Sequence, residues 1–126
     1  LFVSGGIKKL QARGKEAAVL RLPKKPYPIS RMYQIIRTRV FERSYKKLKQ
    51  SGAKRQIITD VQNVIGLLAL GKPLAIKHHD HELTGYFTGY RECHVRADLL
   101  LIYQIDRGNL ILILVDVGSH SYLFGE

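Results

Sequence analysis

The five histidines of this chain are its most versatile side chains for chemistry, and all of them fall in its C-terminal part. Two acidic residues, Asp80 and Asp98, lie close to them in the sequence. Imidazole has an unperturbed pKa of about 6.5, so a histidine can take up or release a proton near neutral pH. Three kinds of site are open to such a group: a metal centre, a structural cluster, or an acid–base site built from His78, His79, His81, His94 and His120.

A metal centre is the first alternative, because the His79-x-His81 spacing on an extended segment could chelate a cation. His94 or His120 would then complete the site. The chain contains no second closely spaced pair of ligands, and catalytic zinc needs about three convergent protein ligands. Cys93 would point away from His94 on a regular strand. We therefore expect neither a metal nor another cofactor.

A structural role is the second alternative. Polar turns collect residues such as His78 and His79, so we interpret these two as ordinary turn residues. Asp98 could likewise form a turn before Leu99. Cys93 is best explained as a small core residue.

Metal-free cleavage of RNA is the third alternative, because RNA carries its own nucleophile, the 2′-hydroxyl group. The reaction needs a base for that proton, an acid for the 5′-oxygen, and positive charge beside the phosphate. An arginine can grip a phosphate through two hydrogen bonds, and an aromatic ring can stack on a splayed base. The side chains that would supply these groups are His81, His94, Asp98 and His120 for proton transfer, Arg91 for the phosphate, and Phe124 for the base.

Apolar periodicity predicts the elements that must hold these side chains. Apolar residues recur at helical spacing in Phe41–Gln50 and again in Lys54–Leu70, so that each segment would have one apolar face. This pattern predicts a hairpin of two helices. Strand-forming residues predict the strands Tyr33–Val40, Tyr86–Tyr90, Tyr90–Val95, Leu99–Ile105 and Leu110–Val117. The connecting segments are a polar turn at His78–Glu82, a hairpin turn at Arg107–Asn109 and a short tail at Ser119–Gly125.

This order of elements predicts an α+β domain, in which a small antiparallel sheet carries the N-terminal helical hairpin on one face. The almost continuous apolar run Leu110–Val117 is typical of a strand that is buried on both faces. In the hairpin turn, we expect Gly108 to take a positive φ, because glycine has no Cβ atom to oppose it.

The charge of the chain is large and uneven. Its 126 residues contain 21 Lys and Arg against 10 Asp and Glu, a formal net charge of +11, which favours a polyanionic partner such as nucleic acid or an anionic membrane surface. Residues 1–31 hold eight basic side chains and one acidic side chain, and they contain Pro23, Pro26 and Pro28. We expect a flexible or loosely docked basic extension over 1–31 and one domain over 32–126.

The expected location is the cytoplasm. A single cysteine cannot form an internal disulfide, which favours a reducing compartment. No apolar run approaches the roughly 20 residues that a membrane span requires. Leu1–Arg31 contains no apolar segment of signal-peptide type.

Four motifs in the C-terminal part carry a resemblance to a known family. They are Asp80–Leu83 (DHEL) with Gly85, Gly89–Val95 (GYRECHV) with Asp98, Leu101–Tyr103 (LIY), and Gly118–Gly125 (GSHSYLFG). In order and spacing they resemble the YafQ branch of the RelE/ParE toxin superfamily, whose pattern is roughly DHxL-x-G, GYRxxHV-x-x-D, LIY and GTHxxLFG. Phe124 matches the phenylalanine of the last motif. The resemblance runs from about Met32 to Gly125, because the first strand and the helical hairpin fit the same fold.

The resemblance implies a bacterial type II toxin. Such a toxin is an mRNA interferase, an endoribonuclease that cleaves mRNA in the ribosomal A site, lies against rRNA there and is neutralised by a cognate antitoxin. For this sequence, it implies His120 as general acid and His81 or Asp98 as general base. His94 would orient Asp98 or stabilise the phosphorane, with help from Arg91.

Two positions depart from the family pattern. Glu82 stands where proline is common, and Leu99 stands where some members carry tryptophan. Base stacking at the second position would either be lost or pass to Tyr86, Phe87 or Tyr90. The alternative to an enzyme is a toxin that only binds, either a ParE-like gyrase poison or an inactive member that binds its antitoxin. The complete set of histidines favours the enzyme, because a binder needs no acid–base groups.

Overall fold

A five-stranded sheet forms the centre of the structure, a computed structural model that describes residues 32–52 and 54–125. The order of its strands is β1-β5-β4-β3-β2. They are β1 (Gln34–Arg37), β2 (His81–Glu82), β3 (Arg91–Arg96), β4 (Leu99–Asp106) and β5 (Ile111–Gly118). The basic extension that we predict over residues 1–31 lies outside the described residues.

The sheet is mixed, whereas we predict an antiparallel one from the sequence. β1 runs parallel to β5, with Gln34 opposite Ile111 and Arg37 opposite Leu114. The other neighbouring strands, β5–β4, β4–β3 and β3–β2, are antiparallel. A parallel pair needs a long crossover connection, and the connection here includes both long helices and three strands. The α+β class with a helical hairpin against one face is confirmed.

The helical hairpin consists of α2 (Arg39–Gln50) and α3 (Arg55–Ala69). α2 begins earlier than predicted because the Thr38 hydroxyl caps it, accepting a hydrogen bond from the Phe41 amide at 3.0 Å. The same hydroxyl is 3.0 Å from the carbonyl oxygen of Leu114 on β5, which ties the start of the helix to the sheet. None of the helices in the described part of the chain is long and apolar enough to cross a membrane.

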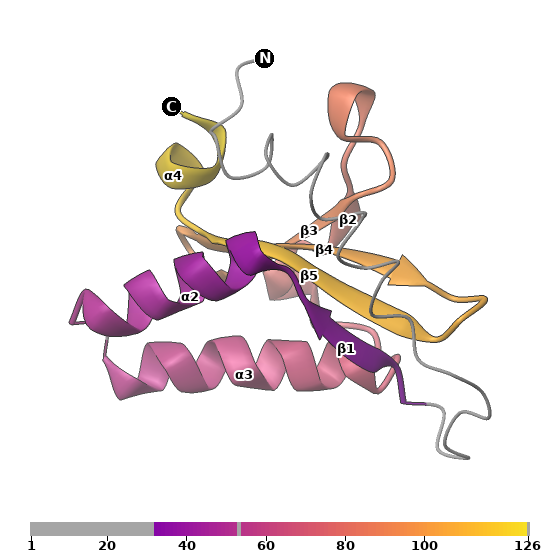
Figure 1. The fold of residues 1–126 in the computed structure, drawn as a ribbon, viewed down its shortest axis with the longest axis horizontal. Coiled ribbons are helices and arrows are strands. Elements are labelled where there is room, and N and C mark those ends of the chain that lie inside the picture. Colours follow the sequence, from indigo (N-terminus) through magenta and orange to yellow (C-terminus); the bar gives the residue numbers. More distant parts are fainter. Residues whose placement is uncertain (1–31, 53, 126) are drawn as a thin grey trace.

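Apolar side chains fill both faces of the sheet. The face covered by α2 and α3, here called the helix face, packs against the larger core, which includes Phe41, Leu68, Leu101, Tyr103 and Leu112. The opposite face, here called the α4 face, carries a smaller core that includes Phe87, Leu100, Ile102, Leu123 and Phe124. Figure 1 shows the two long helices on one side of the sheet and the short helix α4 (His120–Phe124) on the other.

The prediction of a strand over Tyr86–Tyr90 is wrong, because a 3₁₀ turn, η2 (Gly85–Phe87), occupies the start of this segment. Gly85 has a φ of 63° and Gly89 a φ of 100°, and strands do not contain such backbone conformations. The ring of Phe87 is buried in the core of the α4 face. The aromatic residues that suggested a strand therefore belong to a turn that closes over the sheet.

The segment predicted as a tail folds into α4. The Ser119 hydroxyl accepts a hydrogen bond from the Tyr122 amide at 3.1 Å and caps the start of the helix, and Gly125 ends it with a φ of 75°. The Tyr122 ring lies against Gly118, where an added Cβ atom would be 2.5 Å from Tyr122 Cδ2. The Tyr122 hydroxyl is 2.9 Å from Ser44 Oγ. These contacts dock α4 against α2 and the end of β5.

The hairpin turn between β4 and β5 is confirmed, but its backbone differs from the expectation. The residue with positive φ is Leu110, at 55°, and not Gly108. Asp106 accounts for this difference, because its carboxylate accepts hydrogen bonds from the Asn109 amide and side chain, both at 3.0 Å. Because these bonds hold the turn, Gly108 does not need a positive φ.

Candidate active site

The centre of the site is the buried carboxylate of Glu92, which lies between two histidines. Glu92 and His94 are two residues apart on β3, so their side chains lie on the same face of the sheet. β2 pairs with β3 in a register that puts His81 directly opposite Glu92. His81 Nε2 is 3.1 Å from Glu92 Oε1, and His94 Nε2 is 3.9 Å from the same oxygen. One carboxylate therefore faces both imidazoles.

These three residues lie on the α4 face. Glu92 pairs across the sheet with Ile102 and His94 with Leu100, and both partners belong to the core beneath α4. The side chain of Glu92 is 7% exposed, whereas that of His81 is 51% exposed. A buried carboxylate needs a partner, and the imidazoles supply it. His81 is thus the most exposed of the three side chains, and His94 is 24% exposed.

The β3–β4 turn and α4 bring two more predicted residues to the same place. Asp98 Oδ1 accepts a hydrogen bond from the backbone amide of His120 at 3.1 Å. His120 is the first residue of α4, and its ring centroid is 6.3 Å from that of His94. The structure therefore brings His81, His94, Asp98 and His120 into one region. Asp98 takes part through its contact with the backbone of His120.

His78 and His79, which the sequence analysis interprets as turn residues, both contact His94. His78 Nδ1 is 2.7 Å from the backbone carbonyl oxygen of His94. The His79 ring lies edge to face with the His94 ring, at 5.4 Å between centroids. His79 also has a φ of 45°, which is uncommon for a residue with a Cβ atom. Both residues belong to the turn region around η1 (Ile76–His78), and both also define the surroundings of His94.

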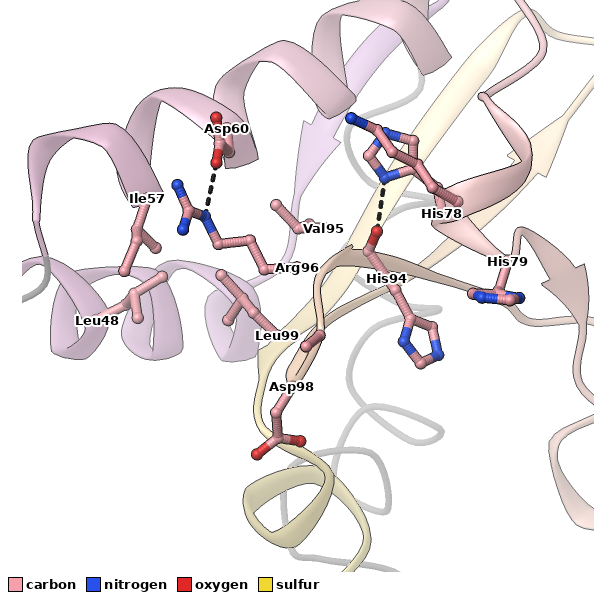
Figure 2. Close-up of a pocket in the computed structure, with 12 residues that line it drawn as sticks. Leu48, Ile57, Asp60, His78, His79, His94, Val95, Arg96, Asp98 and Leu99 are labelled. Carbon is pink, nitrogen blue, oxygen red and sulfur yellow. Dashed lines mark hydrogen bonds and ion pairs between the residues drawn. The ribbon is translucent and has the colours of Figure 1, made fainter.

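An open groove with a volume of about 910 Å³ adjoins these histidines. It runs between the helical hairpin and the β3–β4 turn, and it is lined by His79, His94 and Asp98 together with Lys77. Figure 2 shows the His94 ring and the Asp98 carboxylate directed toward α4, while Arg96 extends the other way, toward Asp60. Arg96 Nε donates a hydrogen bond to Asp60 Oδ2 at 2.7 Å.

The structure does not bring Arg91 to the histidines. Arg91 and His94 are three positions apart on one strand, so their side chains point to opposite faces. Arg91 lies on the helix face, opposite Tyr103. Its guanidinium is 3.4 Å from Asp80 Oδ2 and 3.2 Å from the Tyr103 hydroxyl. The predicted phosphate ligand is therefore engaged on the far side of the sheet.

Tyr90 and Phe124, which are predicted to stack on a base, both belong to the core of the α4 face. Tyr90 is 4% exposed, and burial raises the pKa of its hydroxyl. Its ring is therefore covered in this structure. Phe124 is 6% exposed but borders the site, because its ring centroid is 5.6 Å from that of His120. Tyr86, named above as an alternative stacking residue, is 62% exposed.

Sequence reasoning missed Glu92, although strand alternation could have found it. Alternation places residues two apart on one face and residues three apart on opposite faces. The carboxylate of Glu92 therefore had to accompany His94, and Arg91 had to point away from it. Alternation could not supply the register of β2 on β3, which puts His81 opposite Glu92.

The groups that the site brings together suit proton transfer rather than attack by sulfur. Cys93 is fully buried, as predicted for a core residue. Burial, with the carboxylates of Asp80 and Glu92, raises the pKa of its thiol to about 12. Such a thiol stays protonated at neutral pH and is a poor nucleophile.

Within residues 32–52 and 54–125, no three His, Cys, Asp or Glu side chains are arranged to hold a metal ion.

Bacterial toxins are among the solved structures that share this fold. A metal-bound toxin from Helicobacter pylori is 41% identical to this chain, with a TM-score of 0.66, over 74% of this chain and 100% of that toxin. A chain of the DinJ–YafQ toxin–antitoxin complex from Escherichia coli is 26% identical, with a TM-score of 0.66. That match covers 75% of this chain and 99% of that chain.

Sequence comparison identifies the family within this class. The sequence profile described as "Bacterial toxin of type II toxin-antitoxin system, YafQ" matches residues 33–125. The chain therefore belongs to the YafQ family of bacterial type II toxins, as its motifs predict. The mRNA interferase toxin YafQ of Escherichia coli K12 is 40% identical over 53 residues, which is 42% of this chain. This chain spans about half of the length of that curated relative, 55%.

Proposed function

We propose that this chain is an endoribonuclease that cleaves mRNA in the ribosomal A site and so inhibits translation. The observation that carries the proposal is the contact of two histidines, His81 and His94, with one buried carboxylate, and the position of the His120 ring beside that of His94. The E. coli relative named mRNA interferase supports the same reaction class. Location in the cytoplasm is part of this proposal, because ribosomes are there.

The proposed reaction is attack of the RNA 2′-hydroxyl on the neighbouring phosphorus. His81 removes the 2′-hydroxyl proton at Nδ1, which turns away from the Glu82 carbonyl oxygen at 3.1 Å, while Nε2 stays against Glu92. The 2′-oxygen forms a bond to phosphorus while the bond to the 5′-oxygen breaks. His120 gives its proton to the departing 5′-oxygen. The products are a 2′,3′-cyclic phosphate and a 5′-hydroxyl. One neutral and one protonated imidazole suffice for these two proton transfers, because imidazole can release or take up a proton near neutral pH.

Glu92 supports His81 as the base in preference to Asp98. The Glu92 carboxylate lies 3.1 Å from His81 Nε2, so it stabilises the imidazolium that forms when His81 accepts a proton. Asp98 already accepts a hydrogen bond from the backbone amide of His120. Its role in this proposal is to position His120, the general acid. His94 lies between the two, with Glu92 on one side and the His120 ring on the other.

Contacts with the RNA backbone are the second part of the proposal. Lys77 lines the same groove as His79 and His94, so in this proposal it takes the place of Arg91 as a cation for a bound phosphate. The net charge of +11 favours the surrounding rRNA and mRNA. A cognate antitoxin protein is the expected inhibitor and would form a hetero-oligomer with the toxin, as DinJ does with YafQ in the E. coli complex.

The test uses stalled ribosomes that carry an mRNA in a purified translation system. The chain is added to them, and primer extension then locates the cuts in the mRNA. The wild type should cut in phase with the codons. His81→Ala and His120→Ala should each lower the cleavage rate about 100- to 10,000-fold, the usual contribution of general acid–base groups. Arg107→Ala, in the exposed β4–β5 turn, is the matched control and should cut like the wild type.

Cleavage that survives both histidine substitutions would show that the assignment of the acid and the base is wrong. Intact mRNA with the wild-type chain would refute the endoribonuclease. Growth arrest accompanied by inhibited DNA supercoiling would instead favour the alternative of a gyrase-binding toxin. A supercoiling assay with purified gyrase therefore runs beside the primer extension.

A further inference from the structure

Three residues of the sequence motifs lie outside the proton-transfer site: Asp80 of the first motif, Arg91 of the second and Tyr103 of the third. The structure places them in contact with one another. The Tyr103 hydroxyl donates a hydrogen bond to Asp80 Oδ1, and Arg91 Nε donates to the Tyr103 oxygen at 3.2 Å. Arg91 Nη2 lies 3.4 Å from Asp80 Oδ2, which closes the network.

This network lies on the helix face, behind the histidines. Tyr103 is fully buried on β4, and Arg91 lies opposite it on β3. A buried hydroxyl needs a partner, and this one lies between a carboxylate and a guanidinium. Burial and the hydrogen bond to Asp80 raise the pKa of the Tyr103 hydroxyl. The hydroxyl therefore keeps its proton and remains a donor to Asp80 at physiological pH.

Asp80 immediately precedes His81, the first residue of β2. This strand has two residues, which pair with β3 as His81–Glu92 and Glu82–Arg91. So short a strand has few ladder hydrogen bonds of its own, and its position depends on what holds its ends. His81 is held from two sides: Glu92 contacts its ring on the α4 face, and Tyr103 binds the side chain of the preceding residue, Asp80, on the helix face.

We propose that Asp80, Arg91 and Tyr103 are positioning residues that hold His81 against Glu92. The catalytic consequence rests on the proposed RNA cleavage, whereas the structural part concerns the contact between His81 and Glu92 alone. The proposal separates Arg91 from direct phosphate binding. Losing a phosphate ligand would weaken binding of the ribosome-bound mRNA, whereas losing a positioning residue slows the chemical step after binding.

Tyr103→Phe is the sharpest perturbation, because it removes one oxygen atom from the network. In a single-turnover assay on ribosome-bound mRNA, it should lower the saturating cleavage rate about 10-fold, since misplacing a reacting group by about 1 Å can cost up to about 100-fold. The ribosome concentration for half-maximal rate should not change. In a His81→Ala background, Tyr103→Phe should cause no further loss, because the network acts through that histidine.

A second readout does not depend on cleavage. In nuclear magnetic resonance spectra of the wild type, the ring protons of His81 should show Overhauser contacts with the Glu92 side chain. These contacts should be lost in Tyr103→Phe, and also in Asp80→Asn, which leaves the buried tyrosine in place. Asp106→Asn is the control, because it changes a carboxylate to an amide in the distant β4–β5 turn. It should alter neither readout.

The two readouts separate failure of this proposal from failure of the proposed function. An intact His81–Glu92 contact in both Tyr103→Phe and Asp80→Asn would overturn the positioning network. Equal rate losses by Tyr103→Phe with and without His81 would also overturn it, since a general loss of structure behaves in that way. A wild-type chain that leaves RNA intact would refute the nuclease, while the magnetic resonance contacts would still decide the role of the network.

Discussion

Replacing Asp116 by asparagine should remove part of the pH dependence of this protein's stability. Asp116 lies on β5 and is fully buried. Its Oδ1 accepts a hydrogen bond from the Val117 amide at 2.8 Å, whereas its Oδ2 has no hydrogen-bond partner among the described residues. Burial raises the pKa of this carboxyl to about 6, against the opposing effects of Ser44, the Val117 amide and Arg43.

The sign of the effect follows from proton binding. Between a pKa of 3.8 in the unfolded chain and about 6 in the folded one, the unfolded state releases a proton that the folded state keeps. The free energy of unfolding therefore falls as the pH rises through this window. The window spans about two pH units, and at about 1.4 kcal/mol per unit the loss is about 3 kcal/mol. Below the window both states are protonated, and above it both are ionised.

Urea unfolding of the wild type and of Asp116→Asn at several pH values from about 4 to about 7 measures this loss. The variant should gain about 2.4 kcal/mol over the wild type across that range, because the rest of the change falls below pH 4. Any constant cost of the buried amide cancels, because only the change of the difference with pH is used. Asp106→Asn is the control: hydrogen bonds from Asn109 lower the pKa of Asp106, so it should show no such gain. A difference for Asp116→Asn that stays constant with pH would refute the reasoning.

Three other substitutions test the site and its supports. Glu92→Gln keeps the shape of the side chain but removes the charge that faces His81. The single-turnover cleavage rate should therefore fall about 10- to 100-fold, while the melting temperature should not fall. An unchanged rate would contradict a role for the carboxylate. Thr38→Ala removes the cap of α2 and the contact with β5, and urea unfolding should show a loss of about 1–3 kcal/mol, with a smaller loss for Thr38→Ser. Gly118→Ala puts a Cβ atom 2.5 Å from the Tyr122 ring, so it should lower both the melting temperature and the cleavage rate. The added substitution Tyr122→Leu should recover part of that loss, and equal losses in both backgrounds would show that the ring is not the obstacle.

The elements of this fold that local pattern defines were predictable from the sequence. The apolar stripes locate α2 and α3, and the apolar runs locate β3, β4 and β5, each within two residues of its bounds. The parallel pairing of β1 with β5 was not predictable, because no local pattern records which distant strand becomes a neighbour. η2 was missed because aromatic residues suit both a strand and a buried turn, and α4 because five residues are too few for a helical period.

The site was predictable in its parts but not in its arrangement. The residue types and the motif order pointed to His81, His94, Asp98 and His120, and the structure brings these four together. Their contacts depend on the register of β2 and on the docking of α4, which are tertiary features. The misplacement of Arg91 has a different origin, since simple alternation along β3 already separates it from His94.

The pairing of β1 with β5 has a consequence for the order in which the protein is made. Thr38 and Leu114, which meet at this pair, are 76 residues apart in the chain. Contacts between such distant segments form late and slow the closure of a fold. Synthesis proceeds from the N-terminal side, so α2 and α3 emerge while the strands that cover their apolar faces are still unmade.

His120 emerges after all five strands, since α4 follows β5 in the chain. Acting on ribosomes, as we propose, such a toxin would be harmless to the ribosome that is producing it until α4 has left that ribosome and docked. The completed sheet and the proposed general acid therefore become available together, because only Ser119 separates β5 from α4 in the chain.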